Sequence, residues 1–162
     1  MNNSKKIVLV GHFGVGKSSL IRRFVHNAFS NDYKVTIGVQ ILKKEITIEG
    51  KNLTFIIWDI EGKEDIEQIR PSYLLGTSGF IYVIDPTRSS TYVNLNNEIE
   101  YIKTNFIEAS IVSVANKSDL IDINEFEQEL KQNNLSIHFF SSAKTGENVE
   151  FIFEKLGIDL LK

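Results

Sequence analysis

One glycine-rich octapeptide constrains this chain more than any other feature. Residues 11–18 read GHFGVGKS, which matches the phosphate-loop pattern G-x-x-x-x-G-K-S. The octapeptide follows an apolar run with strand character, Ile7–Val10, and precedes an amphipathic stretch at residues 17–27. That order predicts a strand, a phosphate-binding turn and a helix, and therefore an α/β fold that binds a nucleotide.

The chemistry of phosphate binding accounts for the residue types in this octapeptide. Backbone N–H groups must close around phosphate oxygens, and Gly14 and Gly16 allow that approach because they carry no Cβ. Lys17 offers a point charge to the β- and γ-phosphates, and the hydroxyl of Ser18 can ligate Mg²⁺. A glycine-rich turn with a surface lysine is the alternative interpretation. The residues expected to contact the nucleotide here are Phe13, Gly14, Val15, Gly16, Lys17, Ser18 and Ser19.

Composition and charge exclude several other classes of function. The formal net charge of −3, with basic residues spread along the 162-residue chain, gives no basic footprint for nucleic acid. The absence of cysteine excludes disulfides, thiolate metal sites and cysteine-linked lipids. No apolar run reaches the length of a signal peptide or a membrane span. We therefore expect one cytoplasmic domain that comprises residues 1–162.

Apolar runs of strand length alternate with polar stretches that suit helices. After the first run, further strands are predicted at residues 39–48, 53–58, 80–84, 111–115 and 135–140. Residues 49–52 contain a glycine and predict a hairpin turn, so the first two of these strands should be antiparallel. A short last helix, weakened by Gly157, should close the fold. The predicted fold class is α/β, with a doubly wound, mostly parallel six-stranded sheet, one antiparallel edge strand and helices on both faces.

Ligands of such a sheet bind beyond the carboxyl ends of the strands, and polar motifs occupy those positions in this sequence. Asp59 ends the third predicted strand and is placed to hold Mg²⁺ through a water molecule. The N–H of Gly62, three residues later, should face a γ-phosphate. An Asp-x-x-Gly sequence by itself is usually only a turn, so this prediction depends on the phosphate loop.

Two further polar motifs follow the fifth and sixth predicted strands and point to guanine as the base. Asp119 can accept hydrogen bonds from the N1–H and the exocyclic amine of guanine, which adenine cannot offer. Asn116 should brace the phosphate loop, and the N–H of Ala143 should meet the guanine carbonyl. The residues expected on the base side are Phe29, Asn116, Lys117, Asp119, Ser142, Ala143 and Lys144.

Taken together, these motifs resemble those of the Ras superfamily of small GTPases. They are most similar to those of the Rab branch, although the stretch EDIEQIRPSY resembles the Rho branch. The resemblance covers essentially the whole chain. The matching stretches are GHFGVGKS, FSNDYKVTIGVQ, WDIEG, NKSD and SSAK.

The resemblance implies several further roles. Thr36 is similar to the threonine that binds Mg²⁺ and the γ-phosphate, and Tyr33 is similar to the aromatic lid over the phosphates. Residues 29–40 and 60–76 correspond to the two switches, which effector proteins read and on which an exchange factor and an activating protein could act. GTP, GDP and Mg²⁺ are the implied ligands.

The chain departs from the family pattern beside the expected γ-phosphate. Lys63 stands where the family usually has a water-orienting glutamine, and an ammonium has donors only. Phe13 replaces a small residue and should crowd any arginine finger, so hydrolysis should be slow. Glu61 could repel the phosphate or orient water in place of the glutamine. Lys63 could equally be a surface residue or an internal cation. The catalytic candidates are Lys17, Thr36, Glu61, Gly62 and Lys63.

Two classes of function remain compatible with these residues. One is a GTP hydrolase that cycles slowly as a switch. The other is a persistently GTP-bound binding module whose hydrolysis is vestigial. The printed sequence ends at Lys162 without terminal cysteines, so we expect no prenyl anchor and membrane association only through partners. A longer protein that had lost its tail would look the same.

Overall fold

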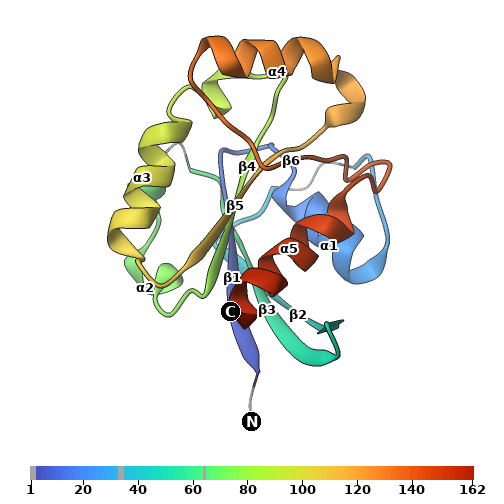
Figure 1. Ribbon diagram of the computed structural model, residues 1–162, viewed down its shortest axis with the longest axis vertical. Helices are drawn as coiled ribbons and strands as arrows, with labels where there is room; N and C mark the ends of the chain where they lie inside the picture. The colour runs from blue at the N-terminus through green and yellow to red at the C-terminus, as the bar shows by residue number, and fades with distance from the viewer. Residues whose placement is uncertain (1–2, 33–34, 64) are drawn as a thin grey trace.

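A six-stranded sheet forms the centre of the computed structural model, which describes residues 3–32, 35–63 and 65–162 (Figure 1). The strand order is β2-β3-β1-β4-β5-β6, and all neighbouring strands are parallel except β2 and β3. This order confirms the predicted doubly wound sheet with one antiparallel edge strand. The strands are β1 (Ser4–Val10), β2 (Val39–Ile48), β3 (Lys51–Ile60), β4 (Gly79–Ile84), β5 (Ser110–Ala115) and β6 (Phe139–Phe140).

Helices cover both faces of the sheet, as predicted. α1 and α5 lie on one face, and α2 and α3 lie on the other (Figure 1). α4 contributes its buried side chains to the same core as α3. The helices are α1 (Lys17–His26), α2 (Pro71–Leu74), α3 (Leu95–Asn105), α4 (Ile123–Gln132) and α5 (Val149–Leu161).

Successive residues of the strands face two separate hydrophobic cores, and for this reason both faces need helices. On β1, Ile7 and Leu9 belong to the first core, beneath α1 and α5. Val8 and Val10 belong to the second core, beneath α2, α3 and α4. All four side chains are buried. The continuous apolar run therefore reflects a strand covered on both sides.

The hairpin between β2 and β3 has a shorter turn than predicted. Only Glu49 and Gly50 lie between the two strands, with φ values of 51° and 76°. Two successive residues with positive φ are typical of a type I′ turn, whose twist matches that of the strands that it joins. Residues 51 and 52, predicted to be part of the turn, are instead the first residues of β3.

The last strand is also shorter than predicted, since only the final two residues of the segment 135–140 pair with β5. The N–H of Leu135 instead donates to the carbonyl of Leu130 at 2.8 Å, at the end of α4. Leu135 and Ile137 are half-buried against the second core. The apolar pattern of this segment therefore comes mostly from packing and not from strand pairing.

The last helix is longer than predicted, and Gly157 does not interrupt it. α5 passes through this position without a break and is 13 residues long. A Cβ at position 157 would lie 2.0 Å from Cδ1 of Ile48 and 3.4 Å from the ring of Phe55. The glycine thus lets α5 pack closely on β2 and β3, and this packing offsets its poor helix propensity.

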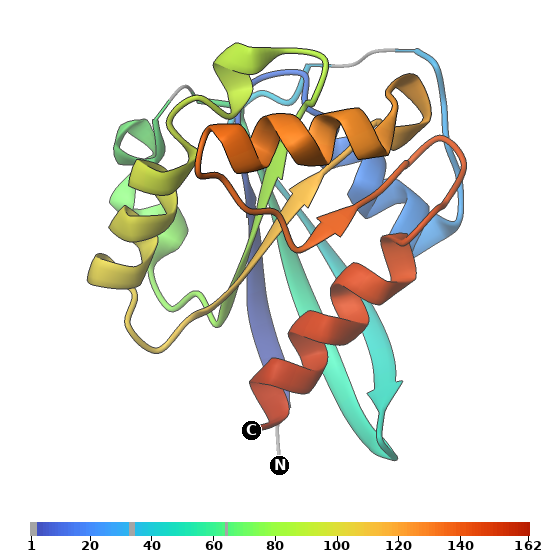
Figure 2. The ribbon, with the colours of Figure 1, turned by 45° about the horizontal axis from the view of Figure 1, so that its top comes forward.

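Because β1, β3, β4, β5 and β6 run in one direction, their carboxyl ends share one edge of the sheet. Figure 2 turns this edge toward the viewer, with α4 and the loops that follow the strands in front. The polar motifs of the sequence follow the strand ends at this edge. The fold therefore gathers them at one place.

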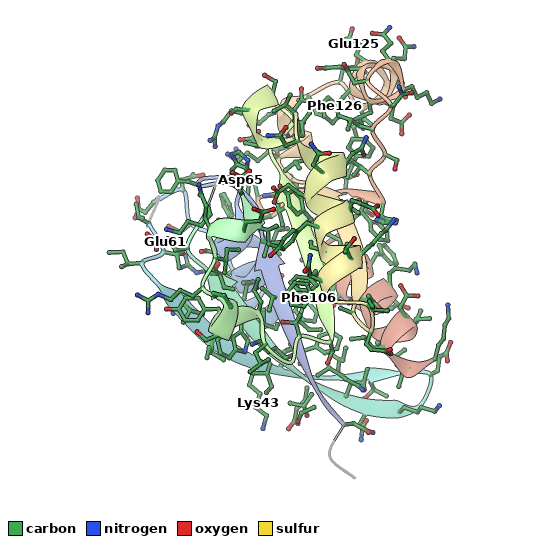
Figure 3. All side chains as sticks on the ribbon, turned by 90° about the vertical axis from the view of Figure 1, so that its left-hand side faces the viewer. Lys43, Glu61, Asp65, Phe106, Glu125 and Phe126 are labelled. Carbon is green, nitrogen blue, oxygen red and sulfur yellow. The ribbon has the colours of Figure 1, made fainter. Side chains whose placement is uncertain are left out.

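Glu98 of α3 is a buried carboxylate that holds the loop after β3. It accepts a hydrogen bond of 2.8 Å from the backbone N–H of Ile66. Burial raises the pKa of Glu98, and the nearby carboxylates of Asp65 and Glu67 raise it further, although the bond from Ile66 lowers it. Figure 3 looks onto α3 and this loop, on which Glu61 and Asp65 are labelled.

Glu98→Gln is expected to stabilise the protein at neutral pH. A raised folded-state pKa means that the stabilising contribution of Glu98 is complete below its ordinary pKa and is lost as the pH rises through the folded-state value. Glutamine still accepts the Ile66 N–H and carries no charge, so the variant should gain on the order of 1 kcal/mol at pH 7.5. Urea unfolding of both proteins between pH 4.5 and 7.5 measures this. A gain that does not grow with pH would contradict the prediction.

Candidate functional site

The phosphate loop joins β1 to α1 and is braced by the loop that follows β5, two strands away at the same edge of the sheet. The side-chain amide of Asn116, which follows β5, donates to the carbonyl of Val15 at 3.1 Å. Gly16 has a φ of 101°, and a Cβ there would lie 2.2 Å from the same amide nitrogen. A larger residue at position 16 is therefore excluded by both conformation and space. The side chain of Val15 is buried in the first core and takes no part in the loop surface.

Lys17 begins α1 with its ammonium turned back under the loop. The side chain is only 7% exposed. Its Nζ donates to the carbonyl oxygens of Gly11 at 2.9 Å and His12 at 3.0 Å. Burial lowers the pKa of Lys17 to about 8, although the charge of Asp59 raises it. The ammonium is thus fixed beneath the loop in an environment that lacks a full counter-charge.

We expect nucleotide binding to take up a proton near Lys17 at alkaline pH. A bound phosphate favours the ammonium, so affinity for GDP should fall about tenfold for each pH unit above the free-protein pKa of about 8. Titration calorimetry of nucleotide-free protein, in two buffers of different ionisation enthalpy at pH 7 and pH 9, measures the uptake. Lys17→Arg is the control, because arginine stays charged at both values. Equal uptake by the variant and the parent at pH 9 would contradict the assignment.

Three oxygen-bearing side chains from different elements meet below the loop. The hydroxyl of Ser18 on α1 contacts a carboxylate oxygen of Asp59 on β3 and lies 2.7 Å from the hydroxyl of Thr36. The hydroxyl of Thr36 lies 3.4 Å from the same Asp59 oxygen. Asp59 is 1% exposed, and its other oxygen, Oδ1, has no hydrogen-bond partner among the described residues. Burial raises the pKa of Asp59, while the bond from Ser18 and the charge of Lys17 lower it.

This arrangement fits a hard divalent cation. A buried carboxylate oxygen without a partner, beside two hydroxyls, is the kind of oxygen donor set that Mg²⁺ uses when phosphates and waters supply its remaining ligands. Within the described ranges, no three His, Cys, Asp or Glu side chains are grouped so as to hold a metal ion. Ser18, Thr36 and Asp59 are thus the predicted metal residues, and the fold brings them together.

A cavity of about 350 Å³ opens above these groups at the carboxyl edge of the sheet. Most of the predicted site residues line it. They are Phe13, Gly14, Gly16, Lys17, Ser18, Ser19, Phe29, Thr36, Gly62, Asn116, Lys117, Asp119, Ala143 and Lys144. The lining also includes Arg22 and Leu120, which the sequence did not single out. Ser30, Asn31, Asp32 and Ile60 line it too and lie within the predicted segments 29–40 and 60–76, although they were not named as site residues. Tyr33, the predicted lid, lies outside the described residues.

The end of the cavity at which a base is expected (the base end) is built from the loops after β5 and β6. Asp119 accepts a hydrogen bond of 2.7 Å from the hydroxyl of Ser142. Ser142 itself is buried and is not part of the cavity lining, so it holds Asp119 and does not face a ligand. The N–H of Ala143 donates to the side-chain oxygen of Asn116 at 3.2 Å. One asparagine therefore ties the phosphate loop to the loop that carries Ala143.

Lys117 links the base end to the phosphate end. Its Nζ donates to the carbonyl of Gly14 and to the carboxylate of Asp85, each at 2.8 Å. Burial by itself would raise the pKa of Asp85, but the hydrogen bonds from Lys117 and Thr87 lower it overall. Arg88 donates to the carbonyl of Phe13 at 2.8 Å. Asp85 and Arg88 were not predicted from the sequence, because they lie in a polar loop without a motif.

These site residues occur in the order and at the spacing of the motifs identified in the sequence. A comparison with protein-family models matches the Ras family over residues 6–162. The chain belongs to the Ras family. It is thus, in general terms, a GTP-binding switch protein of a family with GTPase activity. None of the helices in the described part of the chain is long and apolar enough to cross a membrane.

Within this Ras-family site, the catalytic candidates after β3 are not all brought to the cavity. Gly62 packs on the phosphate loop, and a Cβ there would lie 2.5 Å from the backbone of Phe13. Glu61 and Lys63 do not line the cavity. Their side chains form an ion pair of 3.6 Å and are 39% and 38% exposed. Phe13 is 49% exposed at the rim of the cavity.

Proposed function

We propose that this Ras-family protein binds GTP and GDP with Mg²⁺, hydrolyses GTP slowly and changes the conformation of residues 29–40 and 60–76 with nucleotide state. The observation that carries the proposal is a single cavity with the phosphate loop at one end and Asp119 at the other. These ends correspond to the two chemically distinct parts of a nucleotide. The buried oxygens below the loop add a fitting place for the metal.

Each group in the cavity has a role in this proposal. Lys17 and the loop N–H groups bind the β- and γ-phosphates, and Asp119 binds the guanine edge. The hydroxyls of Ser18 and Thr36 would hold Mg²⁺, and Asp59 would hold it through a water molecule. When bound, Mg²⁺ neutralises charge on the phosphate oxygens. The N–H of Gly62 donates to the γ-phosphate, which keeps residues 60–76 near the nucleotide only while that phosphate is present.

Slow hydrolysis is expected from the residues that stand where the family has its groups beside the γ-phosphate, of which Glu61 and Lys63 do not line the cavity. Lys63 has no acceptor with which to orient an attacking water molecule, and its ammonium is paired with Glu61. Phe13 occupies the rim where an activating protein would insert an arginine. Glu61 remains the alternative group for orienting water, because its carboxylate is an acceptor.

A persistently GTP-bound binding module is the second candidate function. The ion pair between Glu61 and Lys63, outside the cavity lining, favours it. In that case abundance or nucleotide exchange, and not turnover, would control the partners. Both candidates use the same binding site and differ only in hydrolysis.

Partners are proposed on the two segments that change with nucleotide state. Val35, Ile37, Ile41 and Leu75 are exposed apolar side chains on or beside these segments. Exposed apolar groups around a nucleotide-dependent loop suit effector proteins. An exchange factor and an activating protein are expected to act on the same region, and we place the chain nearest to the Rab branch.

Chromatography of the nucleotide that freshly purified protein releases on denaturation tests the proposal. GTP as the main product would support the binding module, and GDP would support the slow hydrolase. Binding of ATP as tightly as GTP would overturn the guanine assignment in both cases.

A further inference from the structure

Arg23, in the last turn of α1, reaches across to the loop after β6. Its Nε donates to the carbonyl of Ala143 at 2.8 Å, and its Nη2 donates to the carbonyl of Lys144 at 2.6 Å. A longer bond of 3.4 Å runs from Nη1 to the side-chain oxygen of Asn27. The first two bonds join residues about 120 positions apart in the chain. The guanidinium therefore fixes two successive peptide carbonyls of one loop.

These partners distinguish Arg23 from an ordinary surface arginine. An exposed guanidinium usually pairs with a carboxylate or with solvent. Within the described ranges, no carboxylate forms an ion pair with Arg23, and the acceptors in its hydrogen bonds are uncharged oxygens. Hydrogen bonds from a charged donor are stronger than those between neutral groups. The planar guanidinium group also loses little conformational entropy when it binds two acceptors.

The loop that Arg23 holds is the one expected to read the base. The carbonyl of Ala143 accepts from Arg23, and the N–H of Ala143 points to Asn116. Asn116 in turn donates to the carbonyl of Val15 in the phosphate loop. α1 thus contacts the nucleotide site twice, through Lys17 at its first residue and through Arg23 at its other end.

We propose that Arg23 is a positioning residue that sets the lifetime of the bound guanine nucleotide by holding the carbonyl groups of Ala143 and Lys144, and thus the loop whose Ala143 N–H is expected to meet the guanine carbonyl. This inference rests on the proposed binding of GDP and GTP. Arg23 does not line the cavity, so it acts through Ala143 and Lys144 and not on the nucleotide itself. A movement of α1 would loosen the phosphate and base ends together.

The experiment measures dissociation of a fluorescent GDP from the full chain in Mg²⁺ with excess unlabelled GDP. Arg23→Ala should accelerate release on the order of 10- to 100-fold, since it removes two charge-assisted hydrogen bonds. Arg23→Lys keeps the charge and one bond and should fall between Arg23→Ala and the parent. His26→Ala is the matched control, because His26 is exposed in the same turn of α1 and does not line the cavity. Its release rate should equal that of the parent.

A second readout separates positioning from general destabilisation. In 6-thio-GDP a sulfur, which is a weak acceptor, replaces the guanine carbonyl oxygen. The parent should release 6-thio-GDP faster than GDP, and Arg23→Ala should bring this ratio close to one. A purely structural role would accelerate the release of both nucleotides and leave the ratio unchanged.

The outcomes distinguish this inference from the proposed function. A parent protein that does not bind GDP would overturn the proposed function, and the inference with it. A parent that binds GDP while Arg23→Ala releases it within twofold of the parental rate would overturn the inference only. An unchanged ratio of 6-thio-GDP to GDP release would also overturn it. If Arg23→Ala does not fold, Arg23→Lys is judged by the same two criteria, the rate of GDP release and the ratio of 6-thio-GDP to GDP release.

Discussion

Asp119→Asn is expected to lower affinity for GDP and GTP on the order of 10²- to 10⁴-fold. The carboxylate lines the cavity and is held by the hydroxyl of Ser142 at 2.7 Å, so its direction is fixed before any ligand binds. Two donors of guanine then face a charged acceptor, and each such bond contributes roughly 1.5–3 kcal/mol. In the variant, one donor of guanine meets the NH₂ group of the amide instead of an acceptor. Competition with a fluorescent GDP measures the loss.

Asp122→Asn supplies a matched control for this substitution. Asp122 lies three positions further on and caps α4 by accepting the N–H of Glu125 at 3.1 Å, outside the cavity lining. Asparagine caps a helix about as well as aspartate, so its affinity for GDP should match that of the parent. The guanine assignment fails if Asp119→Asn binds GDP within threefold of the parent while the control is unchanged.

The sheet could be predicted from the sequence because local pattern and tertiary environment agree along most strands. The run around Val8 is apolar on both faces, and the structure covers both faces. The prediction was wrong where a local sequence feature had a tertiary cause. Ile137 packs on a core without pairing in a strand, and Gly157 is required by the close approach of Ile48 to α5. Neither cause is visible until the neighbouring elements are placed.

The residues of the candidate site likewise fall into those that a local motif could predict and those that it could not. Lys17, Asp59 and Asp119 belong to motifs that follow strands, and parallel strands bring such positions together whatever the helices do. Arg23 and Glu98 belong to no motif. Each is a charged residue within a helix, which in sequence is indistinguishable from a solvated position. Their roles depend on which backbone groups the fold places opposite them, 120 and 32 positions away. Predicting them requires the tertiary structure itself.

The double substitution of Phe13→Gly with Lys63→Gln is expected to raise the rate of single-turnover GTP hydrolysis on the order of 10- to 100-fold. Glutamine offers an acceptor and donors to the attacking water, whereas the Lys63 ammonium has donors only and is paired with Glu61 at 3.6 Å. Removing the Phe13 ring clears the rim of the cavity, where this side chain is 49% exposed. Each single substitution should raise the hydrolysis rate less than the double substitution does, because both residues affect where the attacking water is held. Chromatography of GDP formed from preloaded GTP measures the rate.

Lys43→Gln is the control for the lysine exchange. Lys43 pairs with Glu45 at 3.7 Å, two positions away as in the pair of Lys63 with Glu61, but it lies on β2 outside the cavity. It should leave hydrolysis unchanged. If the double variant is no faster than the parent, neither Phe13 nor Lys63 limits the rate, and Glu61→Gln then decides between the remaining explanations. A further loss would mean that the Glu61 carboxylate orients water, because an ionised carboxylate is the stronger acceptor. A gain would mean that its charge repels the γ-phosphate, because glutamine removes that charge and keeps the shape.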